Sequence, residues 1–152
     1  MKYTQAGLRL LNYNLRSKHW DDFATHTLHA WYRFSTDHSL SDFAWYAQKG
    51  HRNVMNVTHG GALMTYMDYA MSATIWDLSG GLNAYTLQLN NEFVRAARID
   101  RWLFAQVVPT VLADCIELNG TIRVNDPTGL LIMKSYGKFT LPRSPKEIDT
   151  TA

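Results

Sequence analysis

The sequence predicts an α+β fold in which an antiparallel sheet wraps around one long central helix. The helix is indicated by residues Ala62 to Trp76, where apolar side chains occupy every face, as in a helix enclosed by protein on all sides. The sheet is indicated by two aromatic-rich runs before this helix and four runs of strand character after it. A length of 152 residues suits one domain with its own core.

Residues 1–28 predict a helical lead-in, because leucines are interspersed with basic residues in a loosely amphipathic pattern. We expect this segment to pack against the domain, and a role at a membrane surface or in organelle targeting stays open. Three histidines lie here near two aspartates, but their spacing matches no compact metal-ligand motif. The sequence therefore predicts no metal site; the histidines are His19, His26 and His29.

Aromatic residues mark the stretch from Ala30 to Gln48 as a β-hairpin, with a polar loop between its two strands. The central helix follows a turn, with Thr58 as its expected N-cap and Gly80-Gly81 at its end, where a left-handed backbone is easiest to place. The hairpin and the helix are the first two parts of the predicted main domain, residues 29–143.

The segment Tyr85–Phe93 alternates apolar and polar residues, as a half-buried strand does. This alternation points Thr86 away from the leucines, so a role for Thr86 in a site requires a place at a strand end or a dimer seam. Pro109 marks a bulge or an edge, because proline cannot donate to a central ladder. The remaining predicted strands are Arg101–Val108, Cys115–Val124 and Leu130–Leu141, and residues 144–152 are predicted to be a mobile tail.

Composition excludes several classes of protein. A formal net charge of +2 is too small to indicate a nucleic-acid partner, and no apolar run is long enough to span a bilayer. The single cysteine, Cys115, cannot form an internal disulfide, and the N-terminus lacks the apolar core of a secretory signal. These features predict a cytoplasmic protein without a membrane segment.

Two features at the central helix point to chemistry. Asp68 is the one charge in the predicted helix, and a buried carboxylate is costly unless it is paired or used. His59-Gly60-Gly61 precede the helix, where unpaired N–H groups can hold an anion or a carbonyl oxygen that becomes negative during attack. Taken singly, a hydrogen-bonded structural Asp and a structural turn are equally open interpretations.

Gly60 and Asp68 lie about 12 Å apart along one helix, too far for one reacting group to touch both. If they share a site, Asp68 must come from a second copy of the helix that runs antiparallel beside the first. A catalytic interpretation therefore predicts an obligate dimer with paired sites at its interface.

Asn53, His59-Gly60-Gly61 and Asp68 resemble the signature of the hotdog-fold acyl-CoA thioesterases of the phenylacetate-degradation type, with six residues from Asn to His and nine from His to Asp. Thr86 falls where this family usually has a serine or threonine that opens the strand after the helix. The resemblance covers about residues 30–141. It implies the hotdog fold, dimers joined edge to edge through their sheets, and in many members a further pairing into tetramers.

The resemblance also implies hydrolysis of an acyl- or aryl-acyl-CoA to the free acid and CoA, without a cofactor. The Gly60 N–H would polarise the thioester carbonyl with help from Asn53, Asp68 of the facing subunit would activate water or attack directly, and Thr86 would orient that water. His59 is expected to be a structural partner rather than the base. The expected CoA-binding residues are Gly61, Phe93, Arg95, Arg98 and Lys138, and the acyl pocket is expected to include Met64, Met67, Tyr69 and Met71.

Two alternatives remain open. A non-catalytic acyl-CoA-binding or regulatory hotdog module would bind the ligand without releasing a thiol. A hotdog dehydratase or hydratase would need a catalytic histidine, and the His-Phe-Pro run typical of one such branch is missing. The natural acyl group, the choice between base and nucleophile for Asp68, and the choice between dimer and tetramer stay undetermined.

Overall fold

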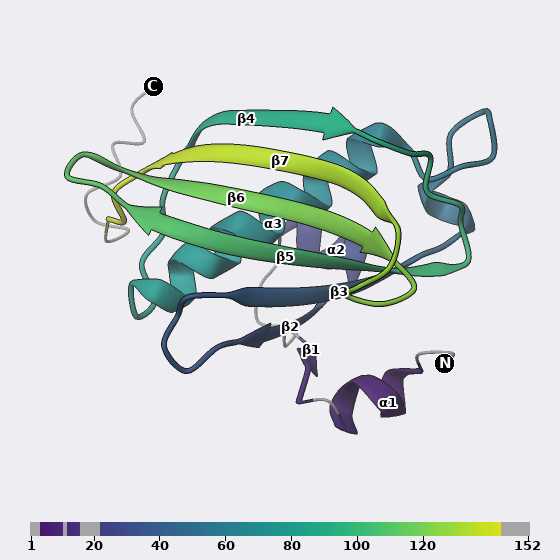
Figure 1. Cartoon of the computed structure of the whole chain (residues 1–152), viewed down its shortest axis with the longest axis horizontal. Coiled ribbons are helices and arrows are strands. Elements are labelled where there is room, and N and C mark those ends of the chain that lie inside the picture. The colour runs from purple at the N-terminus through teal and green to yellow at the C-terminus, as the bar shows by residue number, and fades with distance from the viewer. Residues whose placement is uncertain (1–3, 11, 16–21, 144–152) are drawn as a thin grey trace.

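A computed structural model describes residues 4–10, 12–15 and 22–143 of the chain (Figure 1). The predicted tail, residues 144–152, lies outside the described residues, as does His19. The helices are α1 (Gln5–Leu10), α2 (Phe23–Leu28), the short 3-10 helix η1 (Lys49–His51) and α3 (Gly60–Leu78). The strands are β1 (Asn14–Leu15), β2 (Trp31–Phe34), β3 (Ser41–Ala47), β4 (Thr86–Phe93), β5 (Arg101–Val111), β6 (Cys115–Val124) and β7 (Leu131–Thr140).

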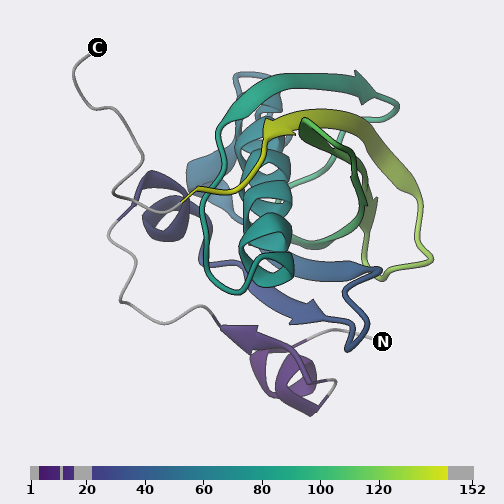
Figure 2. The ribbon, with the colours of Figure 1, turned by 90° about the vertical axis from the view of Figure 1, so that its left-hand side faces the viewer.

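The strands form one antiparallel sheet in the order β1-β2-β3-β5-β6-β7-β4, which curves around α3. Figure 2 shows α3 between this curved sheet and α2. The predicted hairpin is present as β2 and β3. Strand β5 continues through Pro109, which pairs with Leu118 of β6. Proline is tolerated here because the pairing with β3 stops at Ser41 and Val107, so this part of β5 has no strand neighbour on that side.

The inner face of the sheet and α3 enclose the main core. Two glycines on neighbouring strands make room for methionines of the helix, because a Cβ atom at Gly120 would collide with Met67 and one at Gly137 with Met71. Burial also raises the pKa of Tyr66 well above its usual range, and its protonated hydroxyl donates to the carbonyl of Leu103 at 3.1 Å. These contacts fix how closely α3 approaches the sheet.

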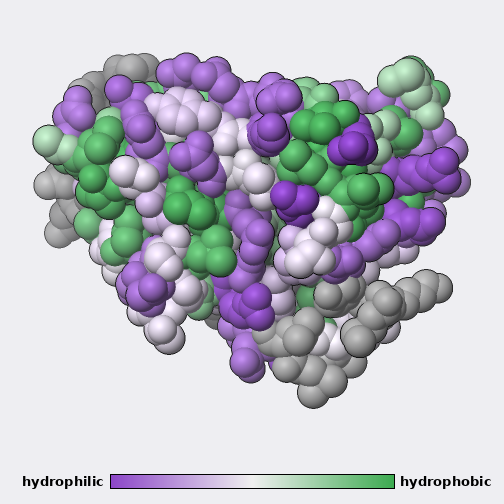
Figure 3. Space-filling model, viewed as in Figure 1, coloured by the Kyte–Doolittle hydropathy of each residue, from purple (hydrophilic) through white to green (hydrophobic). Residues whose placement is uncertain are grey.

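The N-terminal segment covers part of the outer face. Leu8 of α1 and Tyr13 pack with Trp31, Ala44 and Phe104 in a second apolar cluster. Ala44 and Phe104 pair across β3 and β5, whereas their neighbours along each strand point into the main core. The described residues of the predicted helical lead-in thus form two short helices and a strand that joins the sheet. The rest of the outer face mixes hydrophilic and hydrophobic side chains (Figure 3).

Helix α3 is longer than predicted at both ends, and its N-cap is His59 instead of Thr58. The prediction of Thr58 was wrong because this side chain is buried, at 3% exposure, and its N–H donates to the carbonyl of Ala97. At the other end, Gly80 and Gly81 have φ angles of 70° and 110°, as the sequence predicted for a left-handed end.

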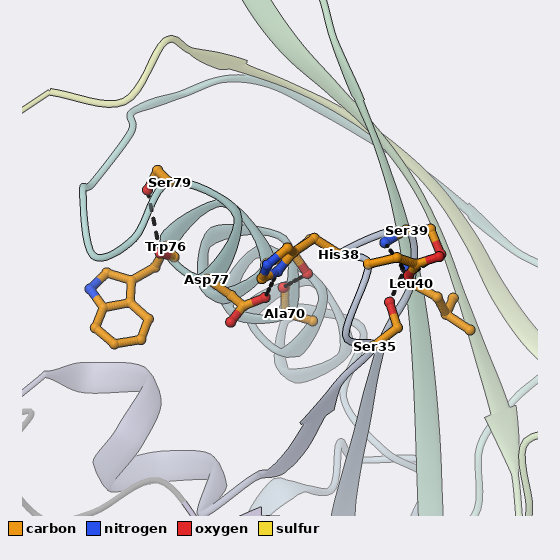
Figure 4. Close-up of polar contacts among 10 residues, drawn as sticks. Ser35, His38, Ser39, Leu40, Ala70, Trp76, Asp77 and Ser79 are labelled. Carbon is orange, nitrogen blue, oxygen red and sulfur yellow. Dashed lines mark hydrogen bonds and ion pairs between the residues drawn. The ribbon is translucent and has the colours of Figure 1, made fainter.

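The last turn of α3 is tied to the loop between β2 and β3. Nδ1 of His38 lies 2.6 Å from a carboxylate oxygen of Asp77, and Ser35 accepts from the N–H of Leu40 within the same loop (Figure 4). Asp77 lies within α3 because the helix continues to Leu78, beyond the predicted end at Trp76. Within the part of the chain that the structure describes, no helix is long and apolar enough to cross a membrane.

Helix α3 is not enclosed on every face within this one chain. Nine of its residues are buried, but a stripe that includes Met64, Thr65, Asp68 and Ser72 is at least partly exposed. These positions are spaced by three and four residues, which places them on one side of the helix. The expectation of a helix surrounded by protein on all sides therefore requires something outside this chain to cover the stripe.

Candidate active site

Asp68 lies in the exposed stripe near the middle of α3, where its carboxylate pairs with Thr86. The Thr86 hydroxyl donates to Oδ1 of Asp68 at 2.8 Å. An ionised carboxylate has lone pairs on both oxygens, so Oδ2 remains able to accept a proton from water. We call Asp68 and Thr86 the acid half-site.

A β-bulge brings Thr86 to Asp68. Thr86 pairs with Phe139 and Leu89 with Gly137, which lie two residues apart on β7, so Leu87 is the extra residue. Because residues two apart on a strand point to the same face, Thr86 and Leu89 both face α3. The simple alternation read from the sequence pointed Thr86 away from the leucines, and the bulge explains why that part of the prediction was wrong.

The second half-site is formed by the loop before α3. The N–H of His59 donates to the carbonyl of His51 at 2.8 Å, and Nδ1 of His59 accepts from the N–H of Gly61 at 2.9 Å. In a neutral ring this places the proton on Nε2 and makes His59 a helix cap. Among the described residues, the Gly60 N–H has no acceptor, so it stays available for a ligand oxygen.

Asn53 forms the turn of this loop. Its Oδ1 accepts from the N–H groups of Met55 at 2.9 Å and Val57 at 3.3 Å. Such bonds are typical of an asparagine that stabilises a turn. They occupy the oxygen and leave the Nδ2 donor for another group. We call Asn53 and His59-Gly60-Gly61 the glycine half-site.

The predicted CoA-binding residues divide into two groups. Phe93 lies beside Gly60, since a Cβ atom at Gly60 would be 3.6 Å from its ring. Arg98 forms an isolated bridge with Val57 of the same loop, and Nη1 of Arg95 donates to the carbonyl of Leu131. Lys138 is not brought to these residues, because it pairs with Gln88 and Glu117 on the face of the sheet opposite α3.

The two half-sites lie at opposite ends of one surface formed by α3 and β4. Thr86, at the start of β4, belongs to the acid half-site and contacts Asp68, whereas Phe93, at the end of β4, lies beside Gly60 of the glycine half-site. Along the helix, Gly60 and Asp68 are separated by about 12 Å. A single chain therefore does not bring the glycine half-site to the acid half-site.

A groove of about 580 Å³ runs beside Asp68. It is lined by Met64, Thr65, Asp68, Tyr69, Ser72, Ala73 and Trp76 of α3, by Leu89, by Asn83, and by Asp22, Phe23 and Ala24 at the start of α2. Met64 and Tyr69 thus lie where the sequence placed an acyl pocket, whereas Met67 and Met71 belong to the core. Sequence reasoning missed Asp22 and Phe23. The local signal was an N-cap, Asp22 with Thr25, but nothing local reveals that α2 packs on α3.

The cap role of His59 gives a testable prediction. His59→Ala should lower the free energy of unfolding by about 1 kcal/mol, because the bond to the Gly61 N–H is lost. For a chain of this size, that is about 3 °C in melting temperature, measured by circular dichroism. His59→Asn should restore stability and retain the thioester hydrolysis that the resemblance implies, since asparagine caps equally well. A stable His59→Asn protein without turnover would assign chemistry to the imidazole.

Comparisons with known proteins agree with this architecture. Residues 55–112 match the family model described as the Thioesterase superfamily. The PaaI protein of the E. coli phenylacetic acid degradation operon is similar in structure, with a TM-score of 0.68 and 18% identity, over 80% of this chain and 85% of that one. Zebra fish thioesterase superfamily member 2 has a TM-score of 0.66 and 16% identity, over 74% and 80%.

A third solved structure, smu.793 from Streptococcus mutans bound to acetyl CoA, has a TM-score of 0.64 and 15% identity, over 74% of this chain and 88% of that one. A search of the curated proteins gave no match. At these identities the likeness concerns the fold, and the predicted α+β hotdog fold is confirmed.

Proposed function

We propose that this chain is an acyl-CoA thioesterase of the phenylacetate-degradation type that works as a two-fold dimer, with each active site built from the acid half-site of one subunit and the glycine half-site of the other. The observation that carries the proposal is the available Gly60 N–H at the start of the helix that carries the Thr86-paired Asp68. The family-model match and the acetyl CoA bound to a structural neighbour support the thioester as substrate.

The position of β4 supports the dimer. Among the described residues it is an edge strand of the sheet with a neighbour, β7, on one side only, so the backbone groups of its outer edge can join another strand. If two copies of β4 pair antiparallel about a two-fold axis, Thr86 at the start of one strand approaches Phe93 at the end of the other. Thr86 contacts Asp68 and Phe93 contacts Gly60, so this pairing would bring complementary half-sites together twice.

The chemistry follows from the two halves. The Gly60 N–H, with the Asn53 amide, would stabilise the negative charge that develops on the carbonyl oxygen during attack. Asp68 would take a proton from the attacking water, or attack the carbonyl itself, while Thr86 holds its other oxygen. In the first route, collapse of the tetrahedral adduct breaks the carbon–sulfur bond, the leaving thiolate takes the proton from Asp68, and the products are the carboxylic acid and the CoA thiol. In the second route, collapse leaves an anhydride between Asp68 and the acyl group, which water hydrolyses to the acid. Arg98, which pairs with Val57 of the glycine half-site loop, and Arg95, three residues before it, would hold the anionic part of CoA.

Release of CoA thiol from a panel of acyl-CoAs, followed with a thiol-reactive dye, tests this function directly. We expect turnover with at least one acyl group, and a dimer or larger assembly by analytical ultracentrifugation. Tight binding of acyl-CoAs without thiol release would instead identify a non-catalytic binding module. A monomer with full turnover would contradict the shared site.

A further inference from the structure

We propose that Asp22 and Phe23, at the start of α2, determine specificity by forming one wall of an acyl pocket that selects uncharged, apolar acyl groups. This inference rests on the proposed function, because it assigns the groove beside Asp68 to the acyl part of the substrate. Neither residue belongs to the two half-sites.

The groove is the natural place for the acyl group because it passes the acid half-site. Asp68 lines it between Met64 and Trp76 of the same helix, and Leu89 adds a further apolar side chain. Its volume of about 580 Å³ lies in the range of small-molecule pockets. A thioester held at Asp68 would therefore extend its acyl chain along these side chains.

The charges that line the groove select against anionic groups. Among the described residues that line it, two are carboxylates, Asp22 and Asp68, and none is a lysine, arginine or histidine. A carboxylate at the end of an acyl chain would meet like charge and no cation among these described lining residues, which is unfavourable in a partly apolar groove. The same reasoning places the phosphates of CoA elsewhere, on the side of Arg95 and Arg98.

Phe23 supplies the apolar part of this wall. Its side chain is 72% exposed in the chain, although it lies at the groove, and α2 packs directly against α3. Leaving a phenyl ring in water forgoes a large apolar contact, which an acyl group in the groove would provide. The N-cap bonds of Asp22 to Thr25, at 2.9 and 2.8 Å, fix the position of this end of α2.

The test compares two CoA thioether analogues of equal chain length, which cannot be hydrolysed, one ending in a methyl group and one in a carboxylate. Their dissociation constants are measured by calorimetry on the full-length protein. Wild type should bind the methyl-ended analogue more tightly. Asp22→Asn should reduce this preference by roughly three- to tenfold, because it removes one of two like charges while asparagine keeps the cap. Phe23→Ala should weaken the methyl-ended analogue about tenfold.

Matched controls exist elsewhere in the chain. Asp126 accepts from the N–H and hydroxyl of Thr128 much as Asp22 does from Thr25, so Asp126→Asn removes the same charge outside the groove. Leu130 is 64% exposed and lies outside the groove, so Leu130→Ala is the corresponding control for Phe23→Ala. Both control variants should bind the analogues as wild type does. An unchanged preference in Asp22→Asn and unchanged affinity in Phe23→Ala would overturn this inference. Thiol release by the same proteins judges the proposed function separately.

Discussion

Asp68→Asn is expected to remove thioester hydrolysis almost completely while the protein stays folded and assembled. Loss of a general base typically lowers turnover by about 10²- to 10⁴-fold, and loss of a nucleophile by at least as much. Asparagine keeps the size of the side chain and an oxygen that accepts the Thr86 hydroxyl, which donates at 2.8 Å in the wild type. The effect should therefore appear in kcat, with little change in melting temperature or in the affinity for a thioether analogue.

Asp77→Asn is the matched control, because it makes the same chemical change in the last turn of the same helix. Asp77 contacts His38 of the β2–β3 loop and lines neither half-site. It should lose some stability and keep its turnover. Wild-type turnover in Asp68→Asn would refute the proposed mechanism, whatever the result for Asp77.

Gly60→Pro is expected to lower kcat by about 10²- to 10³-fold, because it deletes the backbone N–H that the mechanism assigns to the carbonyl oxygen. The backbone suits this change. Gly60 is the first residue of α3, where proline is well tolerated, and His59 before it has a ψ angle of 134°, within the range that proline requires of its predecessor. Thermal unfolding should confirm a folded protein, and thiol release measures the loss.

Gly60→Ala keeps the N–H and adds a Cβ atom 3.6 Å from the Phe93 ring, an ordinary contact. It should be at least tenfold more active than Gly60→Pro; equal activities would show that the N–H does not act.

Refolding Asp68→Asn together with Gly60→Pro tests the shared site. Half of the dimers would be mixed, each with one intact site, so activity should recover to about a quarter of wild type. No recovery would place both halves in the same subunit.

The fold was predictable because its main signals are local. The apolar residues of α3 and the glycines after it indicate a buried helix with a defined end, and the aromatic hairpin indicates β2 and β3. The signature residues predicted two half-sites too far apart to meet within one helix, and the structure places them at opposite ends of the α3–β4 surface. That distance follows from helix geometry alone.

The remaining features depend on contacts that sequence patterns do not report. The bulge at Leu87 is set by pairing with β7, whose partner residues follow at least fifty positions later in the chain, so an alternation rule that ignores the bulge places Thr86 on the wrong face. His59 instead of Thr58 caps α3 because tertiary packing buries the threonine. The groove wall formed by Asp22 and Phe23 requires the docking of α2, which leaves no periodic signal in six residues.

Gly120 and Gly137 set the distance between α3 and the sheet, because Met67 and Met71 of α3 fill the space that side chains at these two positions would take. Asp68, Gly60 and Gly61 belong to this helix, and Asn53 and His59 to the loop that leads into it, so of the two half-sites only Thr86 lies on the sheet. A larger side chain at either glycine would therefore move Asp68 and the Gly60 N–H together relative to β4. In the proposed dimer, these two positions in the sheet would thus control how the half-sites of the two subunits align.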